Sequence, residues 1–439
     1  MKTLQILTLG CSKNTVDTEH ILAQVEGLYE IVPEGEDRAV DCLLLNTCGF
    51  IGDAKEESIQ AILQAAQRKK DGLVGRLMVF GCLSQRYPTE LPDLIPEVDS
   101  WFGARELDPI VKALGATPDR ELDAKRVLSG PHRGYAYLKI SEGCDRRCSY
   151  CAIPYIRGAH RSVPMETLEA ETRFLVSQGV KELVLIAQDT TFYGLDLYHK
   201  RCLGELLQRL SAIDGIEWIR IHYSYPADFP QDVLDQMASN PKVCKYLDIP
   251  LQHISDKLLD KMHRHVTSAW TRELIQKLRD QVPGVVLRTT MIVGHPGEGK
   301  KEFEELLEFV REARFERLGA FTYSEEEGTY GAENFKDSIS EKTKKARLDA
   351  LMELQSGISL ECNQSRVGDV EKVMVDDFVD GVLVCRSRSE SPEVDGEILV
   401  KYDAKAFDDV DPYSLIGEFI TVKILSADMY DLAAELVEL

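Results

Sequence analysis

The sequence predicts an α/β protein in three parts, and two observations support this fold class. Short apolar runs alternate with helical patterns as far as residue 365, which is the rhythm of parallel sheets flanked by helices. From Val367 the pattern changes to five short β runs separated by glycine and aspartate, as in a small β-barrel. We therefore expect an N-terminal open parallel α/β domain over residues 1–115, a central incomplete (β/α)6 barrel over residues 130–365 and a C-terminal β-barrel over residues 366–439.

Composition limits the class of protein. Hydrophobic residues make up 44% and charged residues 29% of the 439 residues, as in globular proteins, and no apolar run approaches the length of a membrane span. The N-terminus reads as a strand rather than a signal peptide, so the eleven cysteines favour thiolates and metal in the cytoplasm over disulfides. The net charge of −22 repels polyanions and attracts basic proteins; it fits a role in solubility alone equally well.

In the N-terminal domain, three predicted strands are each followed by a short turn and a cysteine. The strands are Leu4–Leu9, Cys42–Leu45 and Leu77–Phe80, and the cysteines are Cys11, Cys48 and Cys82. Ligands collect beyond the carboxyl ends of parallel strands, so the three thiols are expected to converge at one edge. The alternative is that they are buried packing residues. Cys42 begins its strand, which predicts a core position at the other edge.

After a polar linker around Gly115 to His132, the central domain opens with a tighter cysteine group. Cys144, Cys148 and Cys151 follow an apolar strand and a turn at Gly143, with three and two residues between them. Such packing suits a polynuclear centre better than a disulfide. A 4Fe-4S cube normally takes four thiolates, so three leave one iron open to another ligand. A zinc knuckle or three unrelated cysteines are the alternatives.

Six strands are counted in the central domain, with helical patterns between them such as Met165–Ser177 and Lys300–Ala313. The strands are Tyr135–Ile140, Glu182–Ala187, Glu217–Ile221, Tyr246–Ile249, Val285–Val293 and Leu318–Tyr323. Six parallel strands instead of eight predict a barrel that is open on one side for a large substrate. Polar groups follow every strand, where barrel enzymes carry their chemistry: Glu142, Gln188–Thr190, His222–Ser224, Gln252 with His253, Gly294 with Glu298, and Tyr323 with Ser324.

The C-x3-C-x2-C triplet, with Tyr150 before its last cysteine, resembles the signature of the radical S-adenosylmethionine enzymes. The resemblance implies that Cys144, Cys148 and Cys151 ligate a 4Fe-4S cluster, whose open iron binds S-adenosylmethionine and cleaves it to a 5'-deoxyadenosyl radical. It also implies cofactor contacts from Tyr150 near the adenine, Gln188, Asp189 and Thr190 at the methionine amino end, Gln252 at the ribose, and Ile292, Gly294 and Tyr323 flanking the adenine. Arg157 and Arg161 either meet a carboxylate of the cofactor or substrate or form ordinary salt bridges.

The N-terminal motifs narrow the resemblance. Leu9–Asn14 with Val16–Glu19, Asn46–Phe50 and Gly81–Leu83 look like the N-terminal domain of the methylthiotransferases, which are radical S-adenosylmethionine enzymes with a second 4Fe-4S cluster. By this resemblance, Cys11, Cys48 and Cys82 ligate that auxiliary cluster, whose free iron carries the sulfur to be inserted. Cys202, Cys244, Cys362 and Cys385 lie in helix or strand patterns without partners and are interpreted as packing residues.

The C-terminal barrel resembles the TRAM domain, an oligonucleotide-binding (OB) type of barrel that often contacts RNA. Between Val367 and Leu439, however, 6 Lys and Arg stand against 18 Asp and Glu, a net charge of −12. Because phosphate binding needs cations, RNA contact through this domain is not expected, and a basic protein surface suits it better.

Several motifs resemble the branch that modifies small-subunit ribosomal protein twelve. They include Gln188–Gly194, His222–Pro226, Tyr246–His253, Leu287–Thr290, Tyr323–Thr329 and Pro392–Gly396. The sequence departs from the family at His295, where phenylalanine is usual, and at His263–His265, and both positions are expected near the edge of the site.

The resemblance implies methylthiolation of the β-carbon of an aspartate in ribosomal protein twelve. One S-adenosylmethionine methylates sulfur on the auxiliary cluster, a second supplies the radical, and an electron donor such as flavodoxin or ferredoxin reduces the cluster. An unactivated C–H bond requires cofactor chemistry of this kind, and no acid–base residue is assigned. The alternatives are methylthiolation of an adenosine in transfer RNA, which the charge of the barrel disfavours, and a non-enzymatic iron–sulfur protein, which predicts four ligands for each cluster.

Overall fold

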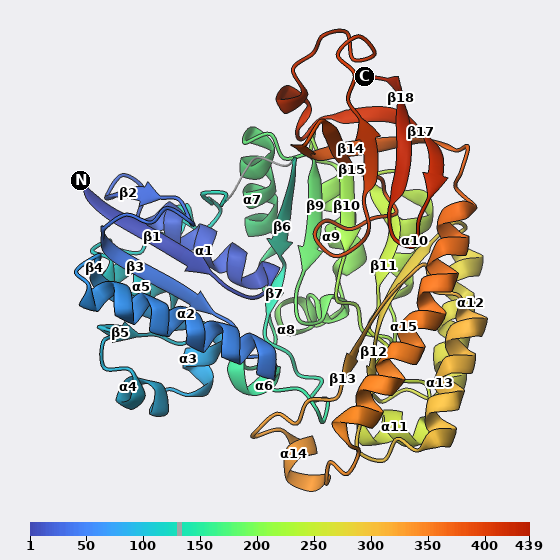
Figure 1. Ribbon diagram of the computed structural model, residues 1–439, viewed down its shortest axis with the longest axis horizontal. Coiled ribbons are helices and arrows are strands. Elements are labelled where there is room, and N and C mark those ends of the chain that lie inside the picture. The colour runs from blue at the N-terminus through green and yellow to red at the C-terminus, as the bar shows by residue number, and fades with distance from the viewer. Residues whose placement is uncertain (130–133) are drawn as a thin grey trace.

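The computed structural model describes residues 1–129 and 134–439 and contains three large sheets arranged in chain order, together with one short two-stranded sheet (Figure 1). Residues 130–133, at the end of the predicted linker and the start of the predicted central domain, lie outside the described residues. The three predicted architectures are all present: an open parallel sheet, a six-stranded parallel sheet and a closed five-stranded barrel.

The N-terminal sheet is parallel, with strand order β2-β1-β3-β4-β5. Its strands are β1 Lys2–Thr8, β2 Tyr29–Val32, β3 Val40–Thr47, β4 Val74–Gly81 and β5 Ser100–Trp101. The helices are α1 Ser12–Gln24, α2 Gly52–Lys70, α3 Cys82–Arg86, α4 Glu90–Leu94 and α5 Leu107–Ala113. Strand β3 is a continuous apolar run because both of its faces are covered: Leu43 and Leu45 pack with α2, whereas Leu44 packs with α1 and α5. Cys42 is buried in the second of these cores, as predicted.

The central sheet has the order β13-β12-β11-β10-β9-β6, with all neighbours parallel, and its first and last strands are not paired with each other. The incomplete barrel is therefore confirmed. Its strands are β6 Tyr135–Lys139, β9 Glu182–Ile186, β10 Trp218–Ile221, β11 Val243–Asp248, β12 Val286–Val293 and β13 Arg317–Thr322, and the short pair β7 Ser141–Glu142 and β8 Arg161–Ser162 stands apart.

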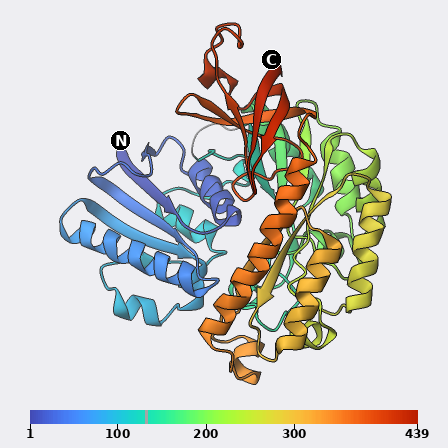
Figure 2. The same cartoon turned by 45° about the vertical axis from the view of Figure 1, so that its right-hand side comes forward.

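Helices cover the outer face of this sheet, and α15 lies beside α13 (Figure 2). The helices of the domain are α6 Ile153–Ile156, α7 Met165–Ser177, α8 Leu195–Tyr198, α9 Leu203–Ser211, α10 Gln231–Ser239, α11 Asp256–Lys261, α12 Ser268–Gln281, α13 Lys300–Ala313, α14 Tyr330–Asn334 and α15 Glu341–Gln364. Helices α7 and α13 begin and end where the sequence pattern predicts. Their apolar residues join the strands in one core that includes Leu175, Leu183 and Phe309.

The C-terminal barrel closes in the order β14-β15-β16-β18-β17. Its strands are β14 Val370–Val379, β15 Val382–Arg386, β16 Ile398–Lys401, β17 Phe419–Ala427 and β18 Leu432–Glu438. The barrel packs against the amino ends of the central strands, where Arg386 pairs with Glu182 and the ring of Phe419 lies 4.7 Å from that of Trp218. The carboxyl ends of the central strands therefore point away from it (Figure 1).

The segment between β15 and β16 fills the inside of the open barrel. Glu390 and Ser391 are each 1% exposed, and Ser391 Oγ lies 2.7 Å from His222 Nε2. Tyr246 Oη donates to Asp395 at 2.6 Å. The buried stretch Glu390–Pro392, which leads into the Pro392–Gly396 motif, is thus a plug in the central domain, although it is part of the C-terminal barrel in sequence.

The predicted linker carries a buried charge. Arg126 forms ion pairs with Glu19 of α1 and Glu171 of α7, and it donates a hydrogen bond to the carbonyl of Tyr137 in β6. All three charged side chains are at most 5% exposed. The linker is therefore part of the joint that fixes the N-terminal domain against the central one. Polar composition alone could not show this.

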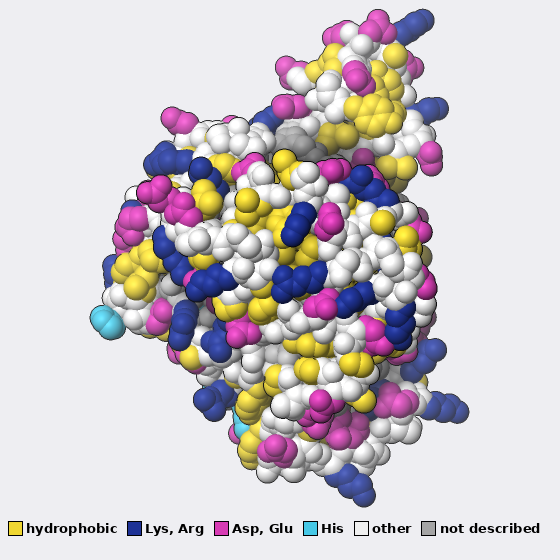
Figure 3. All heavy atoms as spheres, turned by 90° about the vertical axis from the view of Figure 1, so that its left-hand side faces the viewer, with side chains coloured by type: hydrophobic (Ala, Val, Ile, Leu, Met, Phe, Trp, Pro, Cys, Tyr) yellow, Lys and Arg dark blue, Asp and Glu magenta, His cyan; other side chains and the backbone are white. Residues whose placement is uncertain are grey.

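The surface on the N-terminal side carries intermixed basic and acidic side chains rather than a field of one sign (Figure 3). Among the described residues, no helix is both long and apolar enough to cross a membrane. Three of the four predicted packing cysteines, Cys202, Cys244 and Cys385, are buried as expected, while Cys362 is half-buried.

Candidate iron–sulfur and cofactor site

The three cysteines predicted to converge in the N-terminal domain lie on loops that touch one another. Cys11 precedes α1, Cys48 follows β3 and Cys82 begins α3. A Cβ added to Gly10 would lie 2.7 Å from the Cβ of Cys48, and one added to Gly49 would lie 2.7 Å from the Cα of Leu83. Only glycine allows these approaches. The loops are therefore built to bring the three cysteines to one sheet edge.

The cysteines of this group differ in exposure. Cys48 and Cys82 are buried and Cys11 is exposed. Burial raises the pKa of Cys82 to about 11, while the nearby charge of Arg157 opposes the shift. Burial also raises the pKa of Cys48, and the neighbouring Cys11 adds to the increase. The thiols interact with one another, and metal uptake has to release their protons.

The second cysteine group lies on the loop between β7 and α6. Cys144 N donates to the carbonyl of Gly158 at 3.0 Å, and Cys151 N donates to the carbonyl of Cys148 at 3.0 Å. Burial raises the pKa of Cys144 to about 12 and raises that of Cys151 as well, with Cys148 contributing to both shifts. The three thiols are thus neighbours on one ordered turn.

Within residues 1–129 and 134–439, no group of three or more His, Cys, Asp or Glu side chains is placed to hold a metal ion. A single ion requires all of its ligands at one point. A 4Fe-4S cube instead takes its thiolates on separate irons, so its ligands stand farther apart. Both cysteine groups match the cube in ligand type and in loop position.

The two cysteine groups adjoin each other. Cys82 packs in one buried cluster with Ala152, the residue after Cys151. Arg157 Nε lies 3.4 Å from Cys82 Sγ, and its Nη1 is 3.1 Å from Glu142 Oε2. Glu142 accepts a hydrogen bond from Gln188 Nε2 at 2.7 Å. A chain of partly buried polar contacts therefore runs from one cysteine group to the edge of the other.

Arg157 is buried and paired, which supports the salt-bridge interpretation of this residue. Besides Glu142, it contacts Asp17 at 2.7 Å and Asn14 at 2.6 Å, both from α1. Coulombic attraction to Lys139 and Arg157 outweighs the burial of Glu142 and lowers its pKa to about 2. Arg161, by contrast, is exposed in β8.

The residues predicted to hold the methionine end of the cofactor lie together after β9. Gln188 bonds to Glu142 as described above. Asp189 pairs with Arg146 at 2.7 Å and accepts from the backbone N–H of Thr191. Thr190 Oγ1 donates to the carbonyl of His222 at 3.0 Å. Because Asp189 forms an ion pair with an arginine of the cysteine loop, Asp189 helps to hold that loop in place.

The residues predicted around the ribose and adenine form a second group. Gln252, with φ 72°, accepts at its carbonyl from the N–H of Ile292 at 2.8 Å. Gly294 has φ 78° and lies against the side chain of Lys344. The ring of Tyr323 packs edge-on against His295 at 4.9 Å. His295, the departure from the family, is therefore a wall residue of this group.

Unpaired buried atoms at this edge fit a polar cofactor. Seven buried side-chain oxygens of the described residues have no hydrogen-bond partner, and three of them belong to residues of this site: Gln188 Oε1, Ser149 Oγ and Tyr323 Oη. Native interiors rarely leave such atoms unsatisfied. Their position beside the cysteine loop is where the amino, carboxylate and ribose groups of S-adenosylmethionine would supply partners.

Sequence reasoning missed three residues that surround this loop. Arg264 is 4% exposed and reaches both Cys148 and Tyr150. The ring of Tyr225 lies between the guanidinium groups of Arg146 and Arg264, at 3.9 and 4.2 Å. Arg264 was visible only as the centre of the unusual His263–His265 motif, and nothing local linked it to the cysteines.

Three buried histidines make the folded protein sensitive to acid. Burial lowers the pKa of His253 to about 3 and that of His295 to about 4, and it lowers the pKa of His222 well below its usual value. Unfolding restores an ordinary pKa of about 6.5, so the unfolded chain binds more protons below that pH. Stability therefore falls as the pH falls from about 6.5 toward 4. At about pH 5.5, each histidine lowers the free energy of unfolding by about 1.4 kcal/mol relative to about pH 7.5.

Urea unfolding at the two pH values measures this effect: these three histidines together contribute a loss of about 4 kcal/mol, and His20 and His160, whose pKa values burial also lowers, add to it. His295→Phe should reduce the loss by about 1.4 kcal/mol, because it removes one of these groups. The matched control is His199→Gln at an exposed histidine, which should leave the loss unchanged. An equal pH dependence in wild type and His295→Phe would contradict the burial of a neutral imidazole.

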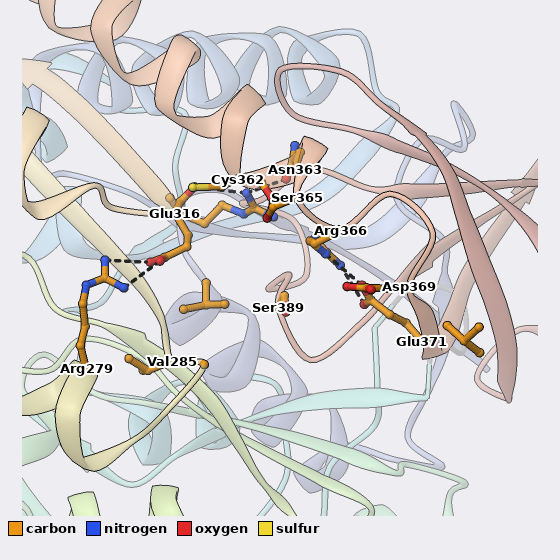
Figure 4. Close-up of a pocket in the computed structure, with 14 residues that line it drawn as sticks. Arg279, Val285, Glu316, Cys362, Asn363, Ser365, Arg366, Asp369, Glu371 and Ser389 are labelled. Atoms are coloured by element: carbon orange, nitrogen blue, oxygen red, sulfur yellow. Dashed lines mark hydrogen bonds and ion pairs between the residues drawn. The ribbon is translucent and has the colours of Figure 1, made fainter.

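A separate cavity of about 660 Å³ lies at the amino ends of β12 and β13, whereas the cysteine groups lie at the carboxyl ends of the strands (Figure 4). Arg279 pairs there with Glu316 at 2.8 Å, and Arg366 pairs with Glu371 at 2.9 Å. Cys362 contributes to its wall. These charges neutralise one another, and the cavity is remote from both cysteine groups because it lies at the opposite ends of the strands.

Three family models match the chain. The one described as the radical SAM superfamily matches residues 138–310, the one described as uncharacterized protein family UPF0004 matches residues 3–103, and the one described as the TRAM domain matches residues 367–437. The matches follow one another along the chain in the order of the three sheets.

Relatives are similar over nearly the whole length. The ribosomal protein uS12 methylthiotransferase RimO of Bacteroides fragilis is 50% identical over 437 residues, which cover 99% of each chain. The protein of the same name from Porphyromonas gingivalis is 49% identical over 436 residues, again 99% of each chain. Among solved structures, the radical S-adenosylmethionine methyltransferase TsrM from Kitasatospora setae has a TM-score of 0.56 at 13% identity, covering 76% of this chain and 74% of that one, which shows a shared fold.

Proposed function

This chain belongs to the family of RimO-type ribosomal protein uS12 methylthiotransferases, and on that basis we propose that it attaches a methylthio group to the β-carbon of an aspartate in uS12. Membership in the radical SAM superfamily implies a 4Fe-4S cluster and S-adenosylmethionine. The main support for sulfur insertion at the aspartate is the pair of adjoining three-cysteine groups, one on each of two parallel sheets.

Two clusters of three protein ligands each suit sulfur insertion. Cys144, Cys148 and Cys151 would hold one cluster, and Cys11, Cys48 and Cys82 would hold the second. When bound, these cofactors supply the radical chemistry that an unactivated C–H bond requires, together with the sulfur to be transferred. Four-ligand clusters would leave no iron for a substrate or cofactor, so the count of three favours an enzyme over an electron carrier.

The chain itself has to position its cofactors and exclude water. Gln188, Ser149 and Tyr323 each offer a buried oxygen with no partner in the described part of the chain, and these atoms would orient the polar groups of S-adenosylmethionine. Asp189 would act through Arg146, which it holds beside the cysteine loop at 2.7 Å. Gln252, Ile292 and Gly294 would supply backbone and apolar contacts to the nucleoside.

The acidic C-terminal barrel supports a basic protein as substrate. Its net charge of −12 attracts a basic ribosomal protein and repels the phosphates of transfer RNA. The six-stranded sheet does not close between β6 and β13, and a protein loop would approach the cofactor site from this side. A small acidic or flavin-containing reductant, of the flavodoxin or ferredoxin kind, would supply the electron.

The test is to incubate the anaerobically reconstituted protein with purified uS12, S-adenosylmethionine and dithionite, and to locate the modification by mass spectrometry. We expect a methylthio group on one aspartate. The variant with Cys11, Cys48 and Cys82 all replaced by alanine should still form 5'-deoxyadenosine but should leave uS12 unmodified. Modification of transfer RNA with no change in uS12 would overturn the proposal in favour of the nucleic-acid branch.

A further inference from the structure

Arg264 is a buried cation whose guanidinium contacts the cysteine loop. Its side chain is enclosed next to Cys148 and Tyr150, with Nη1 3.5 Å from Cys148 Sγ and 3.4 Å from Tyr150 Oη. Its Nη2 donates to the carbonyl of Pro250 at 2.5 Å. One guanidinium N–H therefore faces sulfur while another is fixed to the backbone.

The absence of a carboxylate distinguishes Arg264 from the other enclosed arginines. Arg126, Arg157, Arg220, Arg317 and Arg386 each form an ion pair with a buried Asp or Glu. Among the described residues, no Asp or Glu lies within ion-pair distance of Arg264, and its Nε has no hydrogen-bond partner. Burying a charge without a counter-charge is costly, so a negative group is expected at this position.

Arg264 cannot easily turn away from the sulfur. Its guanidinium lies over the ring of Tyr225 at 4.2 Å, and Tyr225 Oη donates to the carbonyl of Arg264 itself at 2.6 Å. Arg146 also lies over that ring, at 3.9 Å from its centre. Arg146, however, is neutralised by Asp189 at 2.7 Å. Of the two cations on this ring, Arg264 is thus the one whose charge is left for the cysteine loop.

We propose that Arg264 is a positioning residue that donates a charged hydrogen bond to Cys148 and raises the reduction potential of the cluster held by Cys144, Cys148 and Cys151. The inference rests on the proposed function, because it takes these cysteines as ligands of a 4Fe-4S cluster. Hydrogen bonds to sulfur, net charge and burial set the potential of such clusters. The couple takes up one electron from the reductant, and no bond to the protein forms or breaks.

The direction follows from charge. The added electron makes the cluster more negative, so a fixed cation beside its sulfur stabilises the reduced form more than the oxidised form. Hydrogen bonds from charged donors are about twice as strong as neutral ones. Loss of the cation is expected to shift the ratio of reduced to oxidised cluster about tenfold toward the oxidised form at a fixed potential, which is about 59 mV for a one-electron couple.

The experiment uses the full chain with Cys11, Cys48 and Cys82 replaced by alanine, so that only one cluster is titrated. Iron content and the midpoint potential, followed by electron paramagnetic resonance, are compared for this protein and for Arg264→Gln and Arg264→Lys made in it. Arg279→Gln is the matched control, because Arg279 also bonds to backbone carbonyls but lies in the cavity at the far edge of the sheet (Figure 4).

We expect Arg264→Gln to keep its iron and to titrate at a lower potential, and Arg264→Lys and Arg279→Gln to stay near the parent value. A parent-like potential in an iron-loaded Arg264→Gln protein overturns the inference and leaves Arg264 as a packing residue. If Arg264→Gln loses its iron, the iron content of Arg264→Lys becomes the test. Iron retained by Arg264→Lys supports the need for a positive charge at this position, and iron lost from both variants overturns the inference. A parent protein that binds no cluster defeats the proposed function, and the inference with it.

Discussion

Replacing Cys151 with alanine is expected to abolish formation of 5'-deoxyadenosine, while the N-terminal cysteine group keeps its iron. Cys151 is one of only three thiols on its loop, and a cube normally held by four thiolates cannot be expected to persist on two. The loss should be on the order of a thousandfold or more, because the electron reaches the sulfonium from the cluster whose open iron holds S-adenosylmethionine. The measurement is chromatographic detection of 5'-deoxyadenosine after incubation with dithionite.

The matched control for this variant is Cys244→Ala. Cys244 is fully buried beside Trp218 and Tyr246, outside both cysteine groups. Its removal should cost about 1 kcal/mol of stability through lost packing and should leave 5'-deoxyadenosine formation intact. Equal activity in Cys151→Ala and Cys244→Ala would show that the triplet does not hold the reactive cluster.

Replacing Arg126 with methionine is expected to reduce the free energy of unfolding by about 3–5 kcal/mol, because it leaves the buried carboxylates of Glu19 and Glu171 without their cation. The side chain of Arg126 is 1% exposed, so water cannot replace it. Burial already raises the pKa of Glu171 against the opposing charge of Arg126, and removing that charge should raise it further. Urea unfolding with a fixed m-value measures the loss.

Arg120→Met provides the comparison within the same linker. Arg120 pairs with Asp108 and Asp123, but its side chain is 69% exposed. Exposed ion pairs contribute about 0–1 kcal/mol, so this variant should unfold within about 0.5 kcal/mol of wild type. A similar cost for the two substitutions would mean that Arg126 does not join the two domains.

Local pattern was enough to predict much of this protein. The alternation of apolar runs and helical segments predicted where α7 and α13 begin and end, because the signals for the limits of a helix lie in residues close together in the sequence. The close spacing of Cys144, Cys148 and Cys151 is likewise a local feature of the sequence. The strand-end rule then brought Cys11, Cys48 and Cys82 to one edge, although 36 and 33 residues separate them in the chain.

Interactions between distant segments could not be predicted from pattern. Arg126 lies in a polar stretch typical of a solvated linker, and its burial depends on two carboxylates 107 and 45 residues away. Arg264 meets Cys148 across 116 residues. The Pro392–Gly396 segment reads as a barrel loop, yet its neighbours fill the inside of another domain. Such contacts arise from packing between domains, which leaves no periodic signal in a single sequence.

The most direct test of the account is the iron and sulfide content of the anaerobically reconstituted chain and of two triple variants, each lacking one cysteine group. Two three-thiolate clusters predict about eight irons in the wild type and about four in each variant. About four irons in the wild type, unchanged when Cys11, Cys48 and Cys82 are replaced by alanine, would show that the N-terminal cysteines hold no cluster and would contradict sulfur insertion by this chain.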